Sequence, residues 1–132
     1  MIRTRYEIMA MSAKELRIEI AKLKGYEWHC YMFGLSTQTY VLESKRSESF
    51  GVTDMPMPQK ATRLDCPDYP YDIAAAWELV EEAYKKEFAI SIEAMPVISR
   101  RWHIHLGNYN GQDDTLPLAI CRAWLLMMEN EK

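Results

Sequence analysis

Cationic side chains alternate with apolar ones over residues 100–106. Arg101, His103 and His105 are each two positions apart, and Arg100 adjoins the first of them. Because successive side chains of a strand point to opposite faces, this spacing places the three on one face. Guanidinium and imidazole N–H groups donate to phosphate oxygens. The segment therefore predicts a basic strand face that binds a phosphate or a dinucleotide; the alternative is an ordinary exposed polar strand face.

A further arginine, Arg122, lies beside Cys121 in the last apolar segment of the chain. Its guanidinium can hold a phosphate through two parallel N–H donors, so we count it among the ligand-binding candidates. The alternative is a surface or ion-paired arginine whose partner is Glu81 or Asp72.

Aromatic residues lie where predicted elements begin or end. They are Tyr69, Tyr71, Tyr109 and Trp28. An aromatic ring that stacks on a nucleotide base contributes about 1 to 3 kcal/mol, which suits a nucleotide pocket. The alternative for Tyr69 and Tyr71 is that they fix the chain onto the start of the following helix.

Residue patterns for catalysis and metal binding are sparse. The His-x-His segment at 103–105 with Cys30 or Cys66 offers zinc-type ligands, but spacing places no complete set. Asp113 and Asp114 could hold a hard cation, but they precede a helix, where the helix dipole favours negative charge in any case. The sequence has no Gly-x-Ser-x-Gly elbow, no phosphate-binding Gly-rich loop and no His-Glu-x-x-His segment. We therefore expect no enzymatic activity, no cofactor and no metal.

Composition sets the class of protein. The chain has 132 residues, of which 48% are hydrophobic and 27% charged, with a formal net charge of −3. These values are typical of one folded domain and give no global support for binding duplex nucleic acid. No run of 18 apolar residues is present, and the charged N-terminal segment does not resemble a signal peptide, so we expect a cytoplasmic protein with no membrane partner and three reduced cysteines.

The N-terminal half is expected to contain one helix and a strand pair. Ser12 and Glu15 form a capping box, and apolar spacing predicts a helix within 11–25 that ends at Gly25. Aromatic and β-branched clusters predict two strands, over 28–33 and 39–42. Residues 43–70, rich in Ser and Pro, predict a long irregular insertion with one short strand near 50–52.

Residues 72–129 are expected to form a helix-strand-strand-helix core. The expected elements are a helix over 73–86 capped by Asp72, strands over 88–95 and 100–106, a turn-rich segment over 108–114, and a last helix that Thr115 opens. We therefore predict an α+β fold in which three helices pack on an antiparallel sheet, as a single compact domain over 1–132.

Large apolar side chains also predict the core. Trp77, Trp102 and Trp124 lie on apolar stripes, so we expect all three to be buried. The consecutive apolar residues 125–128 and the nine methionines provide more apolar surface than one small core hides. A homo-oligomer is therefore expected.

Three segments resemble a known family. Residues 66–81 carry Pro, Tyr and Asp before Ala-Ala-Trp and Val-Glu, a strand is centred on Trp102, and residues 116–125 read Leu-Pro-Leu-Ala-Ile-Cys-Arg-Ala-Trp-Leu. This pattern resembles small phage proteins with the phage ABA sandwich domain, from which it departs at Pro70, at Trp124 and in an enlarged segment over 34–66. The resemblance implies a phage origin, a small sandwich fold and no enzymatic activity, and it ranks Arg122 first among the ligand candidates.

A weaker resemblance is to phage anti-defence proteins of the Thoeris type, which sequester cyclic ADP-ribose-like signals between subunits. It implies a sponge in the host cytoplasm that binds a small cyclic nucleotide. The residues of this chain that we expect to bind it are the cationic and aromatic candidates Arg122, Arg101, His103, His105, Arg100, Tyr71 and Tyr69. The alternative is an adaptor or inhibitor that binds a host defence protein through the insertion at 43–70.

Overall fold

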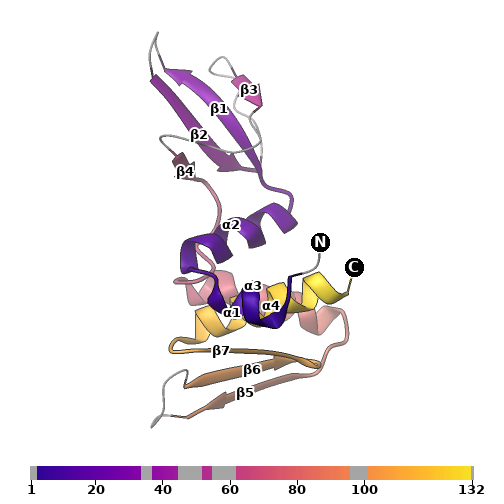
Figure 1. Ribbon diagram of the computed structural model, residues 1–132. Helices are drawn as coiled ribbons and strands as arrows, with labels where there is room; N and C mark the ends of the chain where they lie inside the picture. Colours follow the sequence, from indigo (N-terminus) through magenta and orange to yellow (C-terminus); the bar gives the residue numbers. More distant parts are fainter. Residues whose placement is uncertain (1–2, 34–36, 45–51, 55–61, 96–100, 132) are drawn as a thin grey trace. The chain divides into compact units, whose positions relative to one another are not determined.

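The computed structural model describes residues 3–33, 37–44, 52–54, 62–95 and 101–131. Its contacts divide the chain into two compact units, unit 1 with residues 1–20 and 68–132 and unit 2 with residues 21–67 (Figure 1). Helices and antiparallel strands are both present, which confirms the predicted α+β class. The expectation of a single domain over 1–132 stays a prediction.

Unit 1 is built on a three-stranded antiparallel sheet with strand order β5-β6-β7. Its elements are α1 (Arg5–Ala10), α3 (Ile73–Lys85), β5 (Ile90–Ala94), β6 (Trp102–Leu106), β7 (Tyr109–Asp113) and α4 (Leu116–Asn130). Helix α4 packs on β6 and β7, and α1 and α3 pack against α4, so that the helices lie on one side of the sheet (Figure 1). The opposite side is the outer face of the sheet.

The helices of this unit begin where their capping residues predict. The Asp72 side chain accepts from the backbone N–H groups of Ala74 and Ala75 at 3.0 and 3.5 Å, and α3 follows from Ile73. Thr115 is the N-cap of α4. Both predicted helices are therefore confirmed. No helix in the described parts of the chain is long and apolar enough to cross a membrane.

Strand β7 corrects the prediction of a turn-rich segment over 108–114. Strands β6 and β7 form a hairpin in which Leu106 pairs with Tyr109 across two loop residues, Gly107 and Asn108. Gly107 has a φ of +64°, the left-handed conformation that such tight hairpin loops require. The Gly-Asn dipeptide indicates a hairpin. The polar residues around it are typical of a turn, so the sequence pattern did not indicate the strand that follows.

Helix α1 is an element that the sequence analysis did not predict. Thr4 and Glu7 form a capping box, in which each side chain accepts from the backbone N–H of the other residue at 3.1 Å. The Thr-x-x-Glu spacing is the signal that identifies it. The same pattern at Ser12 and Glu15 predicts a helix, which is confirmed as α2 (Ala13–Leu23).

Unit 2 is a four-stranded sheet with strand order β3-β1-β2-β4. Its strands are β1 (Glu27–Phe33), β2 (Thr37–Glu43), β3 (Val52–Asp54) and β4 (Thr62–Leu64). Strands β1 and β2 pair antiparallel, which confirms the predicted strand pair, and β4 runs parallel to β2. The insertion over 43–70 thus contributes two short strands to this sheet; its segments 45–51 and 55–61, including Phe50 and Gly51 of the predicted short strand, lie outside the described residues.

The tryptophans are buried to different degrees. Trp124 is fully buried in α4, as predicted, whereas Trp102 is half-buried. The prediction for Trp77 is wrong, because 41% of this residue is exposed. The buried side of α3 consists instead of Ala75, Ala76, Leu79, Val80 and Ala83. Small residues let α3 approach α4 closely, and Trp77 falls beside that contact.

The three cysteines are buried, and none of them forms a disulfide. Burial raises the pKa of the Cys121 thiol far above its usual range, an effect that the nearby Arg122 charge only partly opposes. A raised pKa keeps the thiol neutral, and the neutral thiol is a poor nucleophile. At about pH 8, we expect an alkylating reagent to leave Cys121 of the native protein unmodified and to modify it in urea, as mass spectrometry of the digested protein reports. Modification of native Cys121 at the rate of the unfolded chain would contradict this.

Candidate functional site

The outer face of the unit 1 sheet brings the predicted basic residues together. Strand register places His103 between Glu93 and Gln112, and His105 between Ser91 and Asn110. We use the name outer sheet face for Ser91, Glu93, Arg101, His103, His105, Asn110 and Gln112. Ile104, Leu106 and Gly111 are buried on the other face, beneath the helices. The predicted alternation along β6 is therefore correct.

Side chains of this face are joined by hydrogen bonds. Asn110 Nδ2 donates to His105 Nε2 at 3.2 Å, since an amide NH2 group can only donate. Gln112 Nε2 donates to Asn110 Oδ1 at 2.8 Å. Both imidazoles are half-buried, and Arg101, just before β6, is exposed. The outer sheet face thus combines hydrogen-bonded polar side chains with an accessible cation, Arg101.

Arg5 is a basic residue of this site that the sequence analysis missed. Its Nη2 donates to Asn110 Oδ1 at 2.9 Å, and its Nη1 donates to the Asn110 carbonyl oxygen. Helix α1 thereby brings a guanidinium to the edge of β7. The capping box at Thr4 indicates the helix but not its neighbour, because the contact joins residues 105 positions apart.

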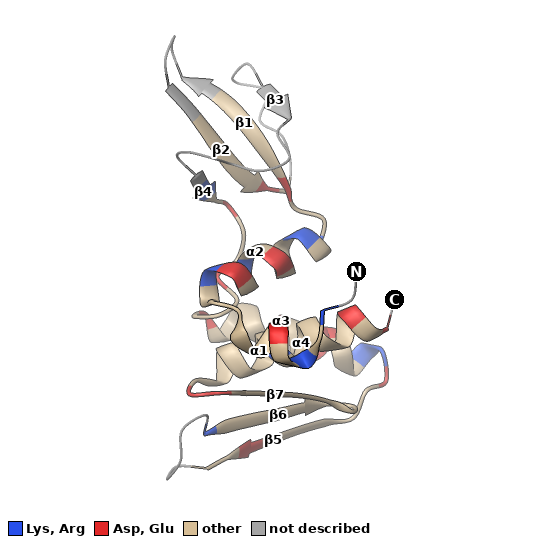
Figure 2. Ribbon diagram, in the orientation of Figure 1, with Lys and Arg blue, Asp and Glu red and all other residues tan. Residues whose placement is uncertain are grey.

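The outer sheet face also carries an acidic group. Glu93 of β5 lies opposite His103 in the strand register. Figure 2 shows acidic colour within β5 and basic colour at the start of β6. The cations thus lie towards Arg101 and towards Arg5, with one carboxylate on the β5 side. A ligand with separated negative charges fits this distribution better than a continuous polyanion.

Arg122 is an ion-paired arginine, as in the alternative, but with a different partner. Only 9% of the residue is exposed. Its Nε donates to Asp113 Oδ2 at 2.7 Å, and its Nη1 donates to the carbonyl oxygens of Ile8 and Met11, each at 2.9 Å. The ion pair is therefore with Asp113 instead of Glu81 or Asp72. Arg122 ties β7 and the end of α1 to α4, and a ligand would have to compete with these internal acceptors.

The two predicted tyrosines do not lie on the outer sheet face. Tyr69 is 2% exposed, in agreement with the alternative that it fixes the chain before α3. Tyr71 is 70% exposed, in the turn that precedes the Asp72 cap. Arg100 lies outside the described residues.

Unit 2 holds a separate buried polar cluster. His29 Nδ1 lies 3.0 Å from Glu43 Oε1, and the Tyr31 hydroxyl donates to the same oxygen. His29 and Tyr31 are two positions apart on β1, so they share one face of the sheet. The carboxylate satisfies both buried groups, which stabilises the hairpin. Within the described residues, no three His, Cys, Asp or Glu side chains gather as metal ligands.

Comparison with known proteins gives one match. The family model described as the phage ABA sandwich domain matches residues 39–125. No curated protein and no solved structure matches the chain. The matched region covers all of α3, β5, β6 and β7 and most of α4, and so includes the whole outer sheet face, whereas Arg5 lies outside it.

Proposed function

The chain belongs to the phage ABA sandwich domain family, whose model matches residues 39–125, and from this premise we propose that it is a phage protein that binds and withholds a small cyclic nucleotide signal. The proposed ligand class is a cyclic ADP-ribose-like molecule. The proposed activity is binding without chemical conversion, in the cytoplasm of the host.

The observation that supports this proposal is the clustering of donors on the outer sheet face. Arg101, His103 and His105 occupy one strand face, and Arg5 reaches the neighbouring strand through Asn110. Arginine holds phosphate through two parallel N–H groups, and hydrogen bonds to charged groups contribute about 1.5 to 3 kcal/mol each. A ligand with two phosphates offers acceptors to cations at both ends of the face.

Uncharged groups of the face suit the rest of a nucleotide. The amides of Asn110 and Gln112 provide donors and acceptors for ribose hydroxyls or a base edge. A binding protein needs no nucleophile or general base, only a complementary surface that is enclosed. In this proposal the ligand lies between subunits, where the sheet face of another copy of the chain completes the site.

Ligand recovery tests this function. The purified full chain is incubated with cyclic dinucleotides and cyclic ADP-ribose isomers, freed of unbound ligand and heated, and the released molecules are identified by mass spectrometry. We expect an intact nucleotide from the wild type and at least about tenfold less from the double variant Arg101→Ala, His103→Ala, because two donor groups are lost.

Lys85→Ala is the matched control, because it removes an exposed cation from α3 instead of the sheet. It should retain as much nucleotide as the wild type. Recovery of a hydrolysed nucleotide would show that the protein converts the nucleotide, which contradicts binding without catalysis. Recovery of nothing from the whole panel would reject the proposal and favour a host protein as the partner.

A further inference from the structure

Strand β5 is an edge of the unit 1 sheet, and its free side is a template for another strand. Gly107 N donates to Ala89 O at 2.8 Å, and Met95 N donates to Arg101 O at 2.6 Å. The backbone groups of alternate residues in an antiparallel strand point to opposite sides. Those of Ile90, Ile92 and Ala94 therefore point away from β6, and no described strand pairs with them.

Within the described part of the chain, this edge lacks the usual protection against pairing. Natural edge strands carry lysine, proline or bulges that prevent association. Strand β5 reads Ile-Ser-Ile-Glu-Ala, with none of these and one charged residue. The opposite edge of the sheet, β7, is partly protected, because Arg5 donates to the Asn110 carbonyl oxygen there.

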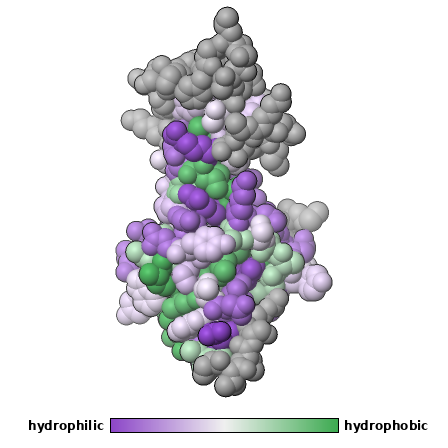
Figure 3. Space-filling view, turned by 90° about the vertical axis from the view of Figure 1, so that its left-hand side faces the viewer, coloured by the Kyte–Doolittle hydropathy of each residue, from purple (hydrophilic) through white to green (hydrophobic). Residues whose placement is uncertain are grey.

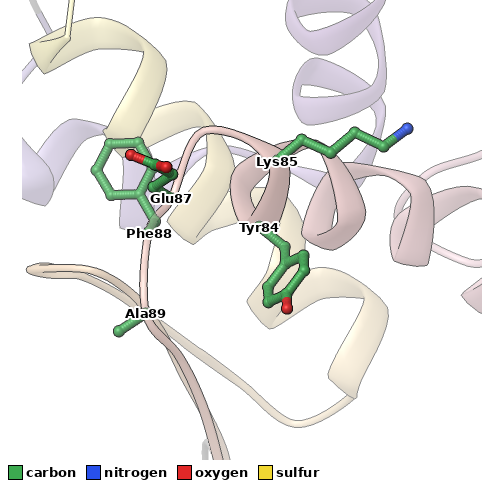
Figure 4. Close-up of a pocket in the computed structure, with 5 residues that line it drawn as sticks. All are labelled: Tyr84, Lys85, Glu87, Phe88 and Ala89. Carbon is green, nitrogen blue, oxygen red and sulfur yellow. The ribbon is translucent and has the colours of Figure 1, made fainter.

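Partly exposed apolar side chains lie both on this strand and on α3. Ile90 and Ile92 are only half-buried, because α4 packs on β6 and β7. On α3, Trp77 is 41% exposed and Tyr84 is 72% exposed. Tyr84 and Ala89 line one open groove where the chain passes from α3 into β5 (Figure 4). Figure 3 shows hydrophobic side chains at the surface of the described part of this unit.

We propose that β5 pairs antiparallel with β5 of a second copy of this chain, about a two-fold axis at Ile92. In this register Ile92 lies opposite Ile92 of the partner subunit. Ser91 then lies opposite Glu93 of the partner subunit, so a hydroxyl donor meets a carboxylate and no like charges face each other. The apolar and polar faces of the strands match on both sides, which is the self-complementarity that a two-fold interface requires.

The area needed for a stable dimer brings α3 into the same interface. Stable interfaces bury about 800 Å² per partner, more than one five-residue strand supplies. The helix stripe of Ile73, Trp77 and Tyr84 lies on one side of α3, since these residues are four and seven positions apart. Large aromatic side chains are the residues that most often anchor protein interfaces. The proposed dimer therefore uses β5 and this stripe together.

Light scattering after size exclusion tests the interface on the full chain. We expect the wild type to have twice the 15.5 kDa chain mass at micromolar concentration. Ile92→Pro removes an N–H that points to the free edge, and Trp77→Glu places a charge in the helix stripe. Each variant should raise the dimer dissociation constant at least about tenfold.

Tyr6→Glu is the matched control, because Tyr6 is an exposed aromatic, at 84%, on α1. It should remain dimeric, and circular dichroism checks that every variant is folded. Trp77→Glu alone decides the outcome if Ile92→Pro fails to fold. A monomeric wild type would overturn the proposal, as would a dimer that folded Trp77→Glu leaves unchanged.

Discussion

Replacing Gly111 with alanine should destabilise unit 1 by about 3 kcal/mol or more. A Cβ atom at this position would lie 2.1 Å from the Ala119 carbonyl oxygen and 2.7 Å from the Ala123 nitrogen. Both are backbone atoms of α4, so no side-chain rotation relieves the clash. The helix would have to move away from β7, and the packing of both elements would be lost. Urea denaturation followed by circular dichroism measures the change in the free energy of unfolding.

Gln112→Ala is the control for this substitution, since Gln112 follows Gly111 on the same strand but points to the outer sheet face. Its effect should be within about 1 kcal/mol, because only one partly buried hydrogen bond is removed. Similar stability of Gly111→Ala and Gln112→Ala would show that α4 does not pack on β7 as described.

Replacing Arg122 with alanine should lower the free energy of unfolding by about 3 to 5 kcal/mol, because it leaves a partly buried carboxylate without its partner. The Asp113 carboxylate would lose its ion pair, and the carbonyl oxygens of Ile8 and Met11 would lose their donor. These carbonyls lie at the end of α1, so this helix should lose its attachment to α4. The same urea titration measures the loss.

Two further variants separate a structural role of Arg122 from a ligand role. Arg122→Lys keeps the charge but not the planar set of donors, so we expect it to recover only part of the stability. Arg101→Ala removes an exposed cation and should leave stability within about 0.5 kcal/mol of the wild type. An Arg122→Ala protein as stable as the wild type that fails to retain nucleotide would assign Arg122 to the ligand instead.

Local sequence signals were sufficient to predict the helices and strands in which they occur. Asp72 and Thr115 identify the starts of α3 and α4, and alternation identifies β5 and β6. Helix α1 carries an equally clear capping box, but its six residues are too short for apolar periodicity. Strand β7 contains Asn, Gly and Gln, which are poor strand formers, and it is held in place by its pairing with β6 and by α4. Tertiary contacts outweighed local preference there.

The candidate site likewise contains residues whose positions the sequence predicts and residues whose positions it does not. The common face of His103 and His105 follows from strand geometry alone, so it was predictable. The contact of Arg5 with Asn110 and that of Arg122 with Ile8 and Met11 join distant parts of the chain. No spacing rule indicates such long-range partners. The contacts with Ile8 and Met11 therefore give Arg122 surroundings that the sequence did not predict.

The position of the ligand is the central claim, and amide NMR spectra of the isotope-labelled protein test it most directly. During titration with cyclic ADP-ribose, we expect the largest shift changes at the amides of Arg101, His103, His105 and Asn110, on the outer sheet face. Amides of unit 2 should change little. Shift changes confined to residues away from the outer sheet face, or no changes for any nucleotide in the panel, would contradict the account.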